Sequence, residues 1–504
     1  MTEVRDELVK KRYASERRFR FYGAAALILT ALFLAVLLID TVIRGIPAFH
    51  ETSVEVDVNV NAADVDPANL PGGNYDKMIK EAFRAEFPEV TGRANQKALT
   101  ALLSTGGADA LRSMVIADPS IIGKTVTVPV LLGADADMFL KGQLTDQTIA
   151  PGKATLHVAR LEGEEGFVLT GEKTGEEAEK QLGLATGDVV RFQGGAVRVT
   201  GMQNGYLKAD PVLPPDAAFS TGNFDAGQWD IVSFSVPQAN RRINDNQALW
   251  LDKLKQDGRI ENSFSWRFFQ AGDSREPELA GIRGALVGSL LTVLVAISLA
   301  LPLGIASAVY LEEFAPKNKW TDLIEVNINN LAAVPSIIFG LLGLAVFLNF
   351  FGLPRSAPLV GGLVLALLVL PTIIIASRAA LKAVPPSITE AALGVGASKQ
   401  QAVFQHVLPL ALPGIMTGTI LGLARAFGET APLLMIGMIA FIADVPQGFT
   451  SAATVLPVQV FLWSDLPELA FKSKTAAAII VLLVVLFALN AIAIYLRKRF
   501  ERRW

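Results

Sequence analysis

Six long windows of the chain are mostly apolar and contain no charged residue: 21–39, 284–310, 326–354, 356–377, 400–424 and 475–496. A bilayer core about 30 Å thick needs about 20 such residues in a helix that rises about 1.5 Å per residue. Each segment meets that length. The pattern predicts six transmembrane helices, at 21–43, about 284–310, about 328–352, about 358–381, about 411–440 and about 475–496.

The first apolar segment follows a basic stretch, as the core of a secretory signal peptide does. Its uncharged run, 21–39, is longer than the 7–15 residues of a signal peptide, and no small-x-small cleavage site follows it. We interpret it as a retained membrane anchor.

Lysine and arginine placement predicts the orientation of the helices. Residues 1–20 hold seven Lys or Arg, and the tail 497–504 is also basic. Since cytoplasmic flanks carry the excess of positive charge, both termini are expected in the cytoplasm. Six spans agree with this, and they place the loop 382–410 inside and residues 44–283 outside.

Residues 44–283 have the patterns of a folded domain with both helices and strands. Val54, Val56 and Val58 alternate with polar residues, which predicts a half-buried strand. Residues 74–116 and 240–257 have helical spacing, and short β-like runs occur between 124 and 210. We therefore predict an inserted α+β extracytoplasmic domain.

Composition separates the chain into two oppositely charged parts. It is 51% hydrophobic with a net charge of −3, but residues 44–280 hold 33 acidic and 23 basic side chains. The 18% of charged residues is below the roughly 25% of soluble domains. A single soluble globule and a disordered chain are both disfavoured, and nothing suggests nucleic-acid binding.

The chain lacks most of the residues that metal sites and common catalytic or ATP-binding sites require. The chain has no cysteine and only three histidines, so we predict no metal site. It contains no G-x-S-x-G, H-E-x-x-H or G-x-x-x-x-G-K-[ST] motif. The sequence therefore offers no motif for hydrolysis or ATP binding in this chain.

The loop 382–410 is predicted to form two short helices with a sharp bend between them. Ser387 with Glu390, and Ser398 with Gln401, have capping-box spacing. Gly394 and Gly396 would stop the first helix. Such a rigid projection would act as a lever by which a soluble partner moves two membrane helices.

This loop resembles the EAA motif of ABC importer permeases, which docks in a groove of the ATPase subunit. The matching residues are Glu390, Ala391, Ala392, Gly396, Leu408 and Pro409. His406 stands where that family usually has an aliphatic residue, and a packed or capping role is favoured for it.

Flanking stretches at 310–315, 324–336 and 424–434 are similar to the PstA-type permease of the phosphate-specific ABC importer, over about 260–504. The resemblance implies an ABC type I importer permease fold in a bacterial inner membrane. It implies a non-catalytic subunit that binds no cofactor itself, with ATP and Mg on a partner chain. It also implies a PstC-type permease subunit, a PstB-type ATPase dimer and an extracytoplasmic phosphate-binding protein as partners, besides membrane lipid.

Arg425 and Glu429 lie in the predicted fifth span, where a central charge costs at least about 2.5–3.5 kcal/mol and marks a polar pathway. They share a helix face with a stripe of small residues, Gly414, Gly418 and Gly422. Pro432 should break the helix near Glu429 and Thr430. We predict a substrate pathway at Arg425, Glu429 and Thr430; the alternative is an ion pair that only fixes packing.

Other interpretations remain open at this stage. The oxyanion carried could be sulfate or molybdate, or the chain could be a receptor with an outer sensor domain. Arg378 and Lys382, near the end of the fourth span, are interpreted as interfacial anchors rather than substrate contacts.

Overall fold

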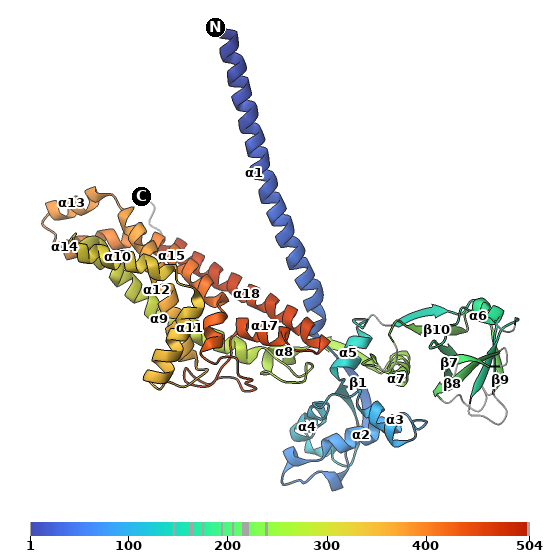
Figure 1. Ribbon diagram of the computed structural model, residues 1–504. Helices are drawn as coiled ribbons and strands as arrows, with labels where there is room; N and C mark the ends of the chain where they lie inside the picture. The colour runs from blue at the N-terminus through green and yellow to red at the C-terminus, as the bar shows by residue number, and fades with distance from the viewer. Residues whose placement is uncertain are drawn as a thin grey trace. The chain divides into compact units, whose positions relative to one another are not determined.

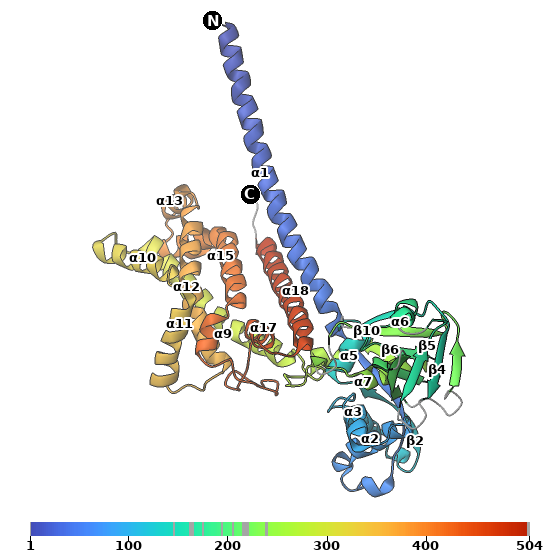
Figure 2. The ribbon, with the colours of Figure 1, turned by 45° about the vertical axis from the view of Figure 1, so that its right-hand side comes forward.

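The computed structural model of the chain describes residues 2–144, 147–160, 166–173, 176–192, 195–203, 206–213, 221–236 and 240–500. The fold divides into two compact units. We call Met1–Phe49 with Ser265–Trp504 the membrane unit, and His50–Phe264 the insert unit. Figures 1 and 2 show the helical membrane unit and the strands of the insert unit from two sides.

The first half of the insert unit is a three-stranded antiparallel sheet covered by helices. The strand order is β11-β1-β2. The alternation predicted around Val54 and Val56 buries these side chains in β1, against Phe83 and Leu111 of the covering helices. The elements are β1 His50–Asn59, α2 Tyr75–Ala85, α3 Arg93–Thr100, α4 Ala108–Ala117, β2 Thr125–Leu131, α5 Ala134–Leu140 and β11 Ile260–Phe264.

The second half is an eight-stranded antiparallel sheet in the order β3-β10-β6-β7-β8-β5-β4-β9. Its core includes Leu156, Val190 and Trp229. The elements are β3 Gln147–Pro151, β4 Leu156–Arg160, β5 Phe167–Thr170, α6 Glu176–Leu182, β6 Val189–Phe192, β7 Gly195–Gln203, β8 Tyr206–Leu213, β9 Thr221–Phe224 and β10 Trp229–Phe234.

Helix α7, Asp245–Gln256, belongs to both halves. Trp250 and Leu251 lie in the core of the first half, whereas Leu249 packs with residues of the eight-stranded sheet. Asp252 forms an ion pair with Arg191 at 3.0 Å, yet burial raises the pKa of its carboxyl. The α+β prediction for this region is confirmed.

The membrane unit is helical. Its elements are α1 Thr2–Gly45, α8 Trp266–Gln270, α9 Arg283–Val309, α10 Lys319–Ala332, α11 Ser336–Gly343, α12 Pro358–Lys382, α13 Pro386–Gly394, α14 Lys399–Ala402, α15 Leu408–Gly428, α16 Ala431–Met435, α17 Leu456–Ser464 and α18 Leu469–Phe500. Three π-helical segments, η7 Tyr310–Phe314, η8 Leu344–Phe350 and η9 Val403–Val407, extend or link them.

Among the described residues, five helices are long and apolar enough to cross a membrane: Arg12–Phe49, Arg283–Phe314, Pro358–Lys382, Lys399–Gly428 and Leu469–Arg499. A sixth span results only if the bent pair Lys319–Ala332 and Ser336–Phe350 is counted as one. The last four residues of the predicted basic tail lie outside the described residues.

Two of the predicted spans differ from straight helices. The pair within the third span is bent by 101°, beside Pro335, which caps α11. A proline disfavours helical geometry in the residue before it, so a break at this place has a local cause. The predicted span 411–440 is also not one helix, because α15 ends at Gly428.

Helix α12 packs against both α9 and α15, and small residues allow the close approach. A Cβ atom added at Gly418 of α15 would lie 2.1 Å from the Cβ of Ala376 in α12. A Cβ atom added at Gly414 would lie 2.7 Å from the Cβ of Ala380, and one added at Gly422 would lie 2.7 Å from the Cγ1 of Val369. The glycine stripe of α15 therefore lies directly on α12. Figure 1 shows these two helices within the membrane unit.

We predict opposite effects for two glycine-to-alanine changes. Gly418→Ala should destabilise the membrane unit by about 1–3 kcal/mol, since α12 and α15 must move apart. Gly23→Ala in α1, where an added Cβ meets nothing within 4 Å, should be neutral or stabilise by about 0.5–1 kcal/mol through helix propensity. Thermal unfolding of both variants in detergent tests this, and equal melting temperatures would contradict it.

Candidate functional site

The loop between α12 and α15 is built from α13, α14 and η9. Ser398 caps α14: its Oγ accepts from the Gln401 N–H at 3.2 Å, while the Gln401 side chain accepts from the Ser398 N–H at 2.9 Å. This capping box is as predicted. The box predicted for Ser387 and Glu390 is wrong, because α13 begins at Pro386 with Pro385 in the cap position.

The turn after α13 depends on one glycine. Gly396 has φ +91°, in the left-handed region, whereas Gly394 is the last residue of α13 itself. The Gly396 N–H donates to the Leu393 carbonyl at 3.0 Å and the Ala397 N–H to the Ala392 carbonyl at 3.1 Å. This is a Schellman motif, in which glycine avoids a steric penalty.

The loop has a buried base and an exposed tip. Val403 and Val407 of η9 are buried in a core with Ala308 of α9 and Leu381 of α12. By contrast, Glu390 and Ala391 are exposed, as are Leu393 and Val395. His406 is exposed too, so it does not pack in this core, and the capping role that was the other interpretation stays a prediction. A rigid apolar knob thus projects from a base fixed to three helices.

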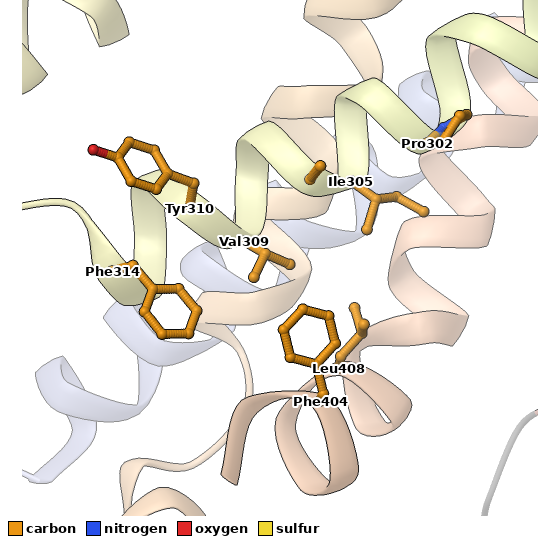
Figure 3. A pocket seen from close by; sticks show the side chains of 8 residues that line it. Pro302, Ile305, Val309, Tyr310, Phe314, Phe404 and Leu408 are labelled. Atoms are coloured by element: carbon orange, nitrogen blue, oxygen red, sulfur yellow. The ribbon is translucent and has the colours of Figure 1, made fainter. Parts of the chain in front are cut away.

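An apolar groove lies beside this base. It has a volume of about 360 Å³ and is lined from α9 and η7 on one side and from η9 and the start of α15 on the other. Figure 3 shows Tyr310, Phe314, Phe404 and Leu408 among its side chains. The motif residue Leu408 therefore contributes to the groove, while Pro409 lies in the first turn of α15.

The charged pair lies at the other end of α15. Arg425 Nε is 3.4 Å from Glu429 Oε1, and the side chains are 44% and 17% exposed. Glu429 has extended backbone geometry (φ −76°, ψ 128°), and Thr430 precedes α16. The break expected beside Pro432 is therefore confirmed. Helix α16 has only five residues, so few of its peptide dipoles add up near Arg425.

The break in α15 is supported by a neighbouring helix. A Cβ added at Gly340 of α11 would lie 2.7 Å from the Cα of Pro432. Only a residue without a side chain permits this approach. The Arg425–Glu429 pair is thereby placed at a helix interruption that the surrounding packing fixes.

A second charged cluster escaped the sequence analysis. Arg378 Nη2 lies 2.9 Å from Glu325 Oε2 of α10, and its Nε lies 3.4 Å from Glu312 Oε2 of η7, which Lys382 Nζ also approaches at 3.6 Å. The Arg378 side chain is only 13% exposed. It forms ion pairs within the unit instead of the interfacial anchor that was predicted. Its partners lie more than 50 residues away, so no local pattern shows them.

Among the described residues, no three His, Asp or Glu side chains are grouped so that they could hold a metal ion. The candidate functional residues are those described above: the exposed loop, the Arg425–Glu429 pair at the helix break and the Arg378 cluster.

Comparison with known families gives two matches. Residues 300–504 match the model described as binding-protein-dependent transport system inner membrane component. Residues 6–150 match a domain of unknown function, DUF3333, which comprises α1 and the first part of the insert unit.

Individual relatives agree with the first match. The chain is 30% identical over 245 residues to the probable ABC transporter permease protein YqgI of Bacillus subtilis, covering 46% of this chain and 83% of the relative. It is 31% identical over 244 residues to the phosphate transport system permease protein PstA 1 of Mycobacterium tuberculosis, covering 48% and 78%. PstA of Mycobacterium leprae is 31% identical over 240 residues, covering 47% and 77%.

Solved structures give weaker likenesses. The MetNI methionine ABC transporter, in inward-facing conformations, matches at 17% identity with a TM-score of 0.34, covering 44% of this chain and 95% of that chain. A bacterial ABC transporter involved in the import of the acidic polysaccharide alginate matches at 16% with a TM-score of 0.34, covering 43% and 79%.

The apolar helices and the sequence relatives define a membrane-spanning permease subunit of an ABC importer. The chain belongs to the binding-protein-dependent transport system inner membrane component family. Permease subunits of this family are not themselves catalytic. They act with an ATPase and a substrate-binding protein, and the resemblance to PstA-type permeases is confirmed at about 30% identity.

We predict that Gly396→Ala weakens ATPase binding while Gly394→Ala does not. Alanine at φ +91° carries a left-handed penalty of about 1–2 kcal/mol, which should loosen the α13–α14 turn. Gly394 is helical, and an added Cβ there meets nothing within 4 Å. Co-purification with the ATPase subunit measures the effect; equal recovery of ATPase with both variants would contradict it.

Proposed function

We propose that this chain is the permease subunit of an ATP-driven inorganic phosphate importer in a bacterial inner membrane, with both termini in the cytoplasm. It forms half of the translocation pathway with a PstC-type permease subunit. The observation that carries the proposal is the Arg425 guanidinium, partly exposed at the interruption of α15, in a chain similar to PstA proteins.

Arg425 supplies the attraction for an oxyanion. A guanidinium matches phosphate geometry with its planar set of donors. Its 44% exposed side chain is accessible in this subunit, whereas Glu429 is mostly covered. The positive charge of Arg425 is therefore more accessible to an approaching anion than the negative charge of Glu429.

Glu429 sets the strength of binding. It neutralises Arg425 in the empty state and competes with the anion in the occupied state. A transporter needs binding that is favourable enough for entry yet weak enough for release. The i,i+4 pair at a long 3.4 Å separation suits this requirement, since little must be broken when phosphate arrives.

The exposed loop supplies the coupling. Glu390, Ala391 and Leu393 face outward from α13, and the base of the loop packs against α9 and α12. We infer that a PstB-type ATPase dimer, which binds ATP and Mg, engages this knob and moves these helices. An extracytoplasmic phosphate-binding protein delivers the substrate from the other side.

Neutralising the pathway arginine tests the substrate role. In proteoliposomes containing the assembled complex, Arg425→Gln should reduce ATP-dependent uptake of labelled phosphate at least tenfold, as expected from losing a charge-assisted interaction of about 1.5–3 kcal/mol. The control is Arg283→Gln, at the exposed start of α9. Full uptake by Arg425→Gln would refute the pathway role, and competition by excess sulfate would show that the transporter also binds another oxyanion.

Reversing the charge of the loop tests the coupling. Glu390→Lys should abolish phosphate uptake while leaving membrane insertion intact, because the side chain of residue 390 is exposed on the projecting knob. Uptake and the ATPase rate are measured on the same vesicles. Unchanged uptake would remove the loop from the mechanism.

A further inference from the structure

Arg378 joins three separate elements at the end of α12 that leads into the coupling loop. Its guanidinium contacts Glu325 of α10 at 2.9 Å and Glu312 of η7 at 3.4 Å, from a position one turn before α12 ends. Only the residues 383–385 separate α12 from α13. The cluster is therefore close in the chain to the knob that we assign to the ATPase.

The chemistry of the cluster favours arginine. One planar guanidinium presents donors in two directions and bridges two carboxylates, which the single ammonium of lysine does less well. Glu312 is 19% exposed and Arg378 13% exposed, so solvent screens this contact little. Lys382, which is 57% exposed, adds a longer contact to Glu312. Two acidic and two basic side chains leave the cluster neutral.

Segment η7 is also in contact with the coupling loop. Phe314 of η7 and Phe404 of η9 line the same groove (Figure 3), and Lys399 Nζ of α14 lies 5.4 Å from the centre of the Phe314 ring. Both η7 and η9 are π-helical, a geometry frequent at functional sites. The loop thus contacts η7 directly, and α12 holds η7 through Glu312.

Helix α10 depends on the cluster in a different way. Every residue of α10 is exposed or half-buried, so this helix has little core of its own. It packs on α12, where Ile328 joins the apolar core and Glu325 contacts Arg378. The ion pair is therefore a polar link between α10 and α12 in addition to this apolar contact.

We propose that Arg378 is a positioning residue for transport: through Glu325 and Glu312 it passes displacement of the coupling loop to α10 and to the end of α9. This inference rests on the coupling role of the loop in the proposed function. It assigns no contact with substrate to Arg378. The proposal adds a path from the coupling loop to α10 and to the end of α9, which are not parts of the loop.

Distance measurement in the assembled complex tests this path. Because the chain contains no cysteine, Trp320→Cys on α10 and Phe487→Cys on α18 introduce a unique pair of spin labels. Both side chains are exposed, at 74% and 67%. We expect the distance between the labels to change between the nucleotide-free and the ATP-vanadate-trapped complex, and Arg378→Gln to abolish that change. An unchanged response in Arg378→Gln would overturn the proposal, as would a wild-type complex in which α10 does not move.

Two further variants separate positioning from folding. Glu325→Gln removes only the α10 contact of a 39% exposed side chain, and it should abolish the α10 response in complexes that assemble normally. Arg283→Gln is the control and should keep the response. A retained response in assembled Glu325→Gln complexes would also overturn the proposal.

The ratio of phosphate transported to ATP hydrolysed gives a second readout. Arg378→Gln should lower the phosphate moved per ATP hydrolysed severalfold, because displacement of the loop would no longer reach α10. A purely structural role would lower the amount of complex without altering that ratio. If wild-type complex shows the α10 response without phosphate uptake, the proposed substrate fails and the positioning role stands. If Arg378→Gln keeps the wild-type ratio, the positioning role fails and the substrate stands.

Discussion

The close packing of α12 against α9 and α15 is the constraint on which the membrane unit depends. The contact between α12 and α15 requires Gly418 of α15 beside Ala376 of α12. The contact between α12 and α9 requires Gly362 of α12, where an added Cβ would lie 2.4 Å from the Cβ of Val295. Association of apolar helices in lipid gains little from the hydrophobic effect, so van der Waals contact between small residues supplies the stabilisation. The packing of α12 against α9 and α15 fixes the positions of the coupling loop and of the helix break.

Charges within the membrane unit are tied to that packing in two ways. The Arg425–Glu429 pair is local, spans the end of α15 and leaves the arginine partly exposed. The Arg378 cluster is non-local and joins η7, α10 and α12; Arg378 and Glu312 are largely covered, whereas Glu325 and Lys382 are 39% and 57% exposed. A local pair with an exposed arginine is cheap to rearrange, which suits a substrate contact. The covered contact between Arg378 and Glu312 costs more to break, which suits transmission of movement.

The insert unit is organised around α7. This helix contributes Trp250 to the core of the three-stranded half and Leu249 to that of the eight-stranded half, and Asp245 is fully buried with Arg198 and Arg241 as partners. Removing either half would expose one face of α7. The two sheets therefore form one folding unit, although the family match at 6–150 ends between them.

The sequence by itself determined the apolar helices, the capping box at Ser398, the break beside Pro432 and the alternation that buries Val54 and Val56, because each depends on residues a few positions apart. Pro335 favours a break before α11, but only the tertiary structure decided its angle of 101°, the exposure of His406 and the partners of Arg378. Glu312 and Glu325 are 66 and 53 residues away from Arg378 along the chain. Contacts at that separation follow from how α9, α10 and α12 pack, which no periodicity in the sequence records.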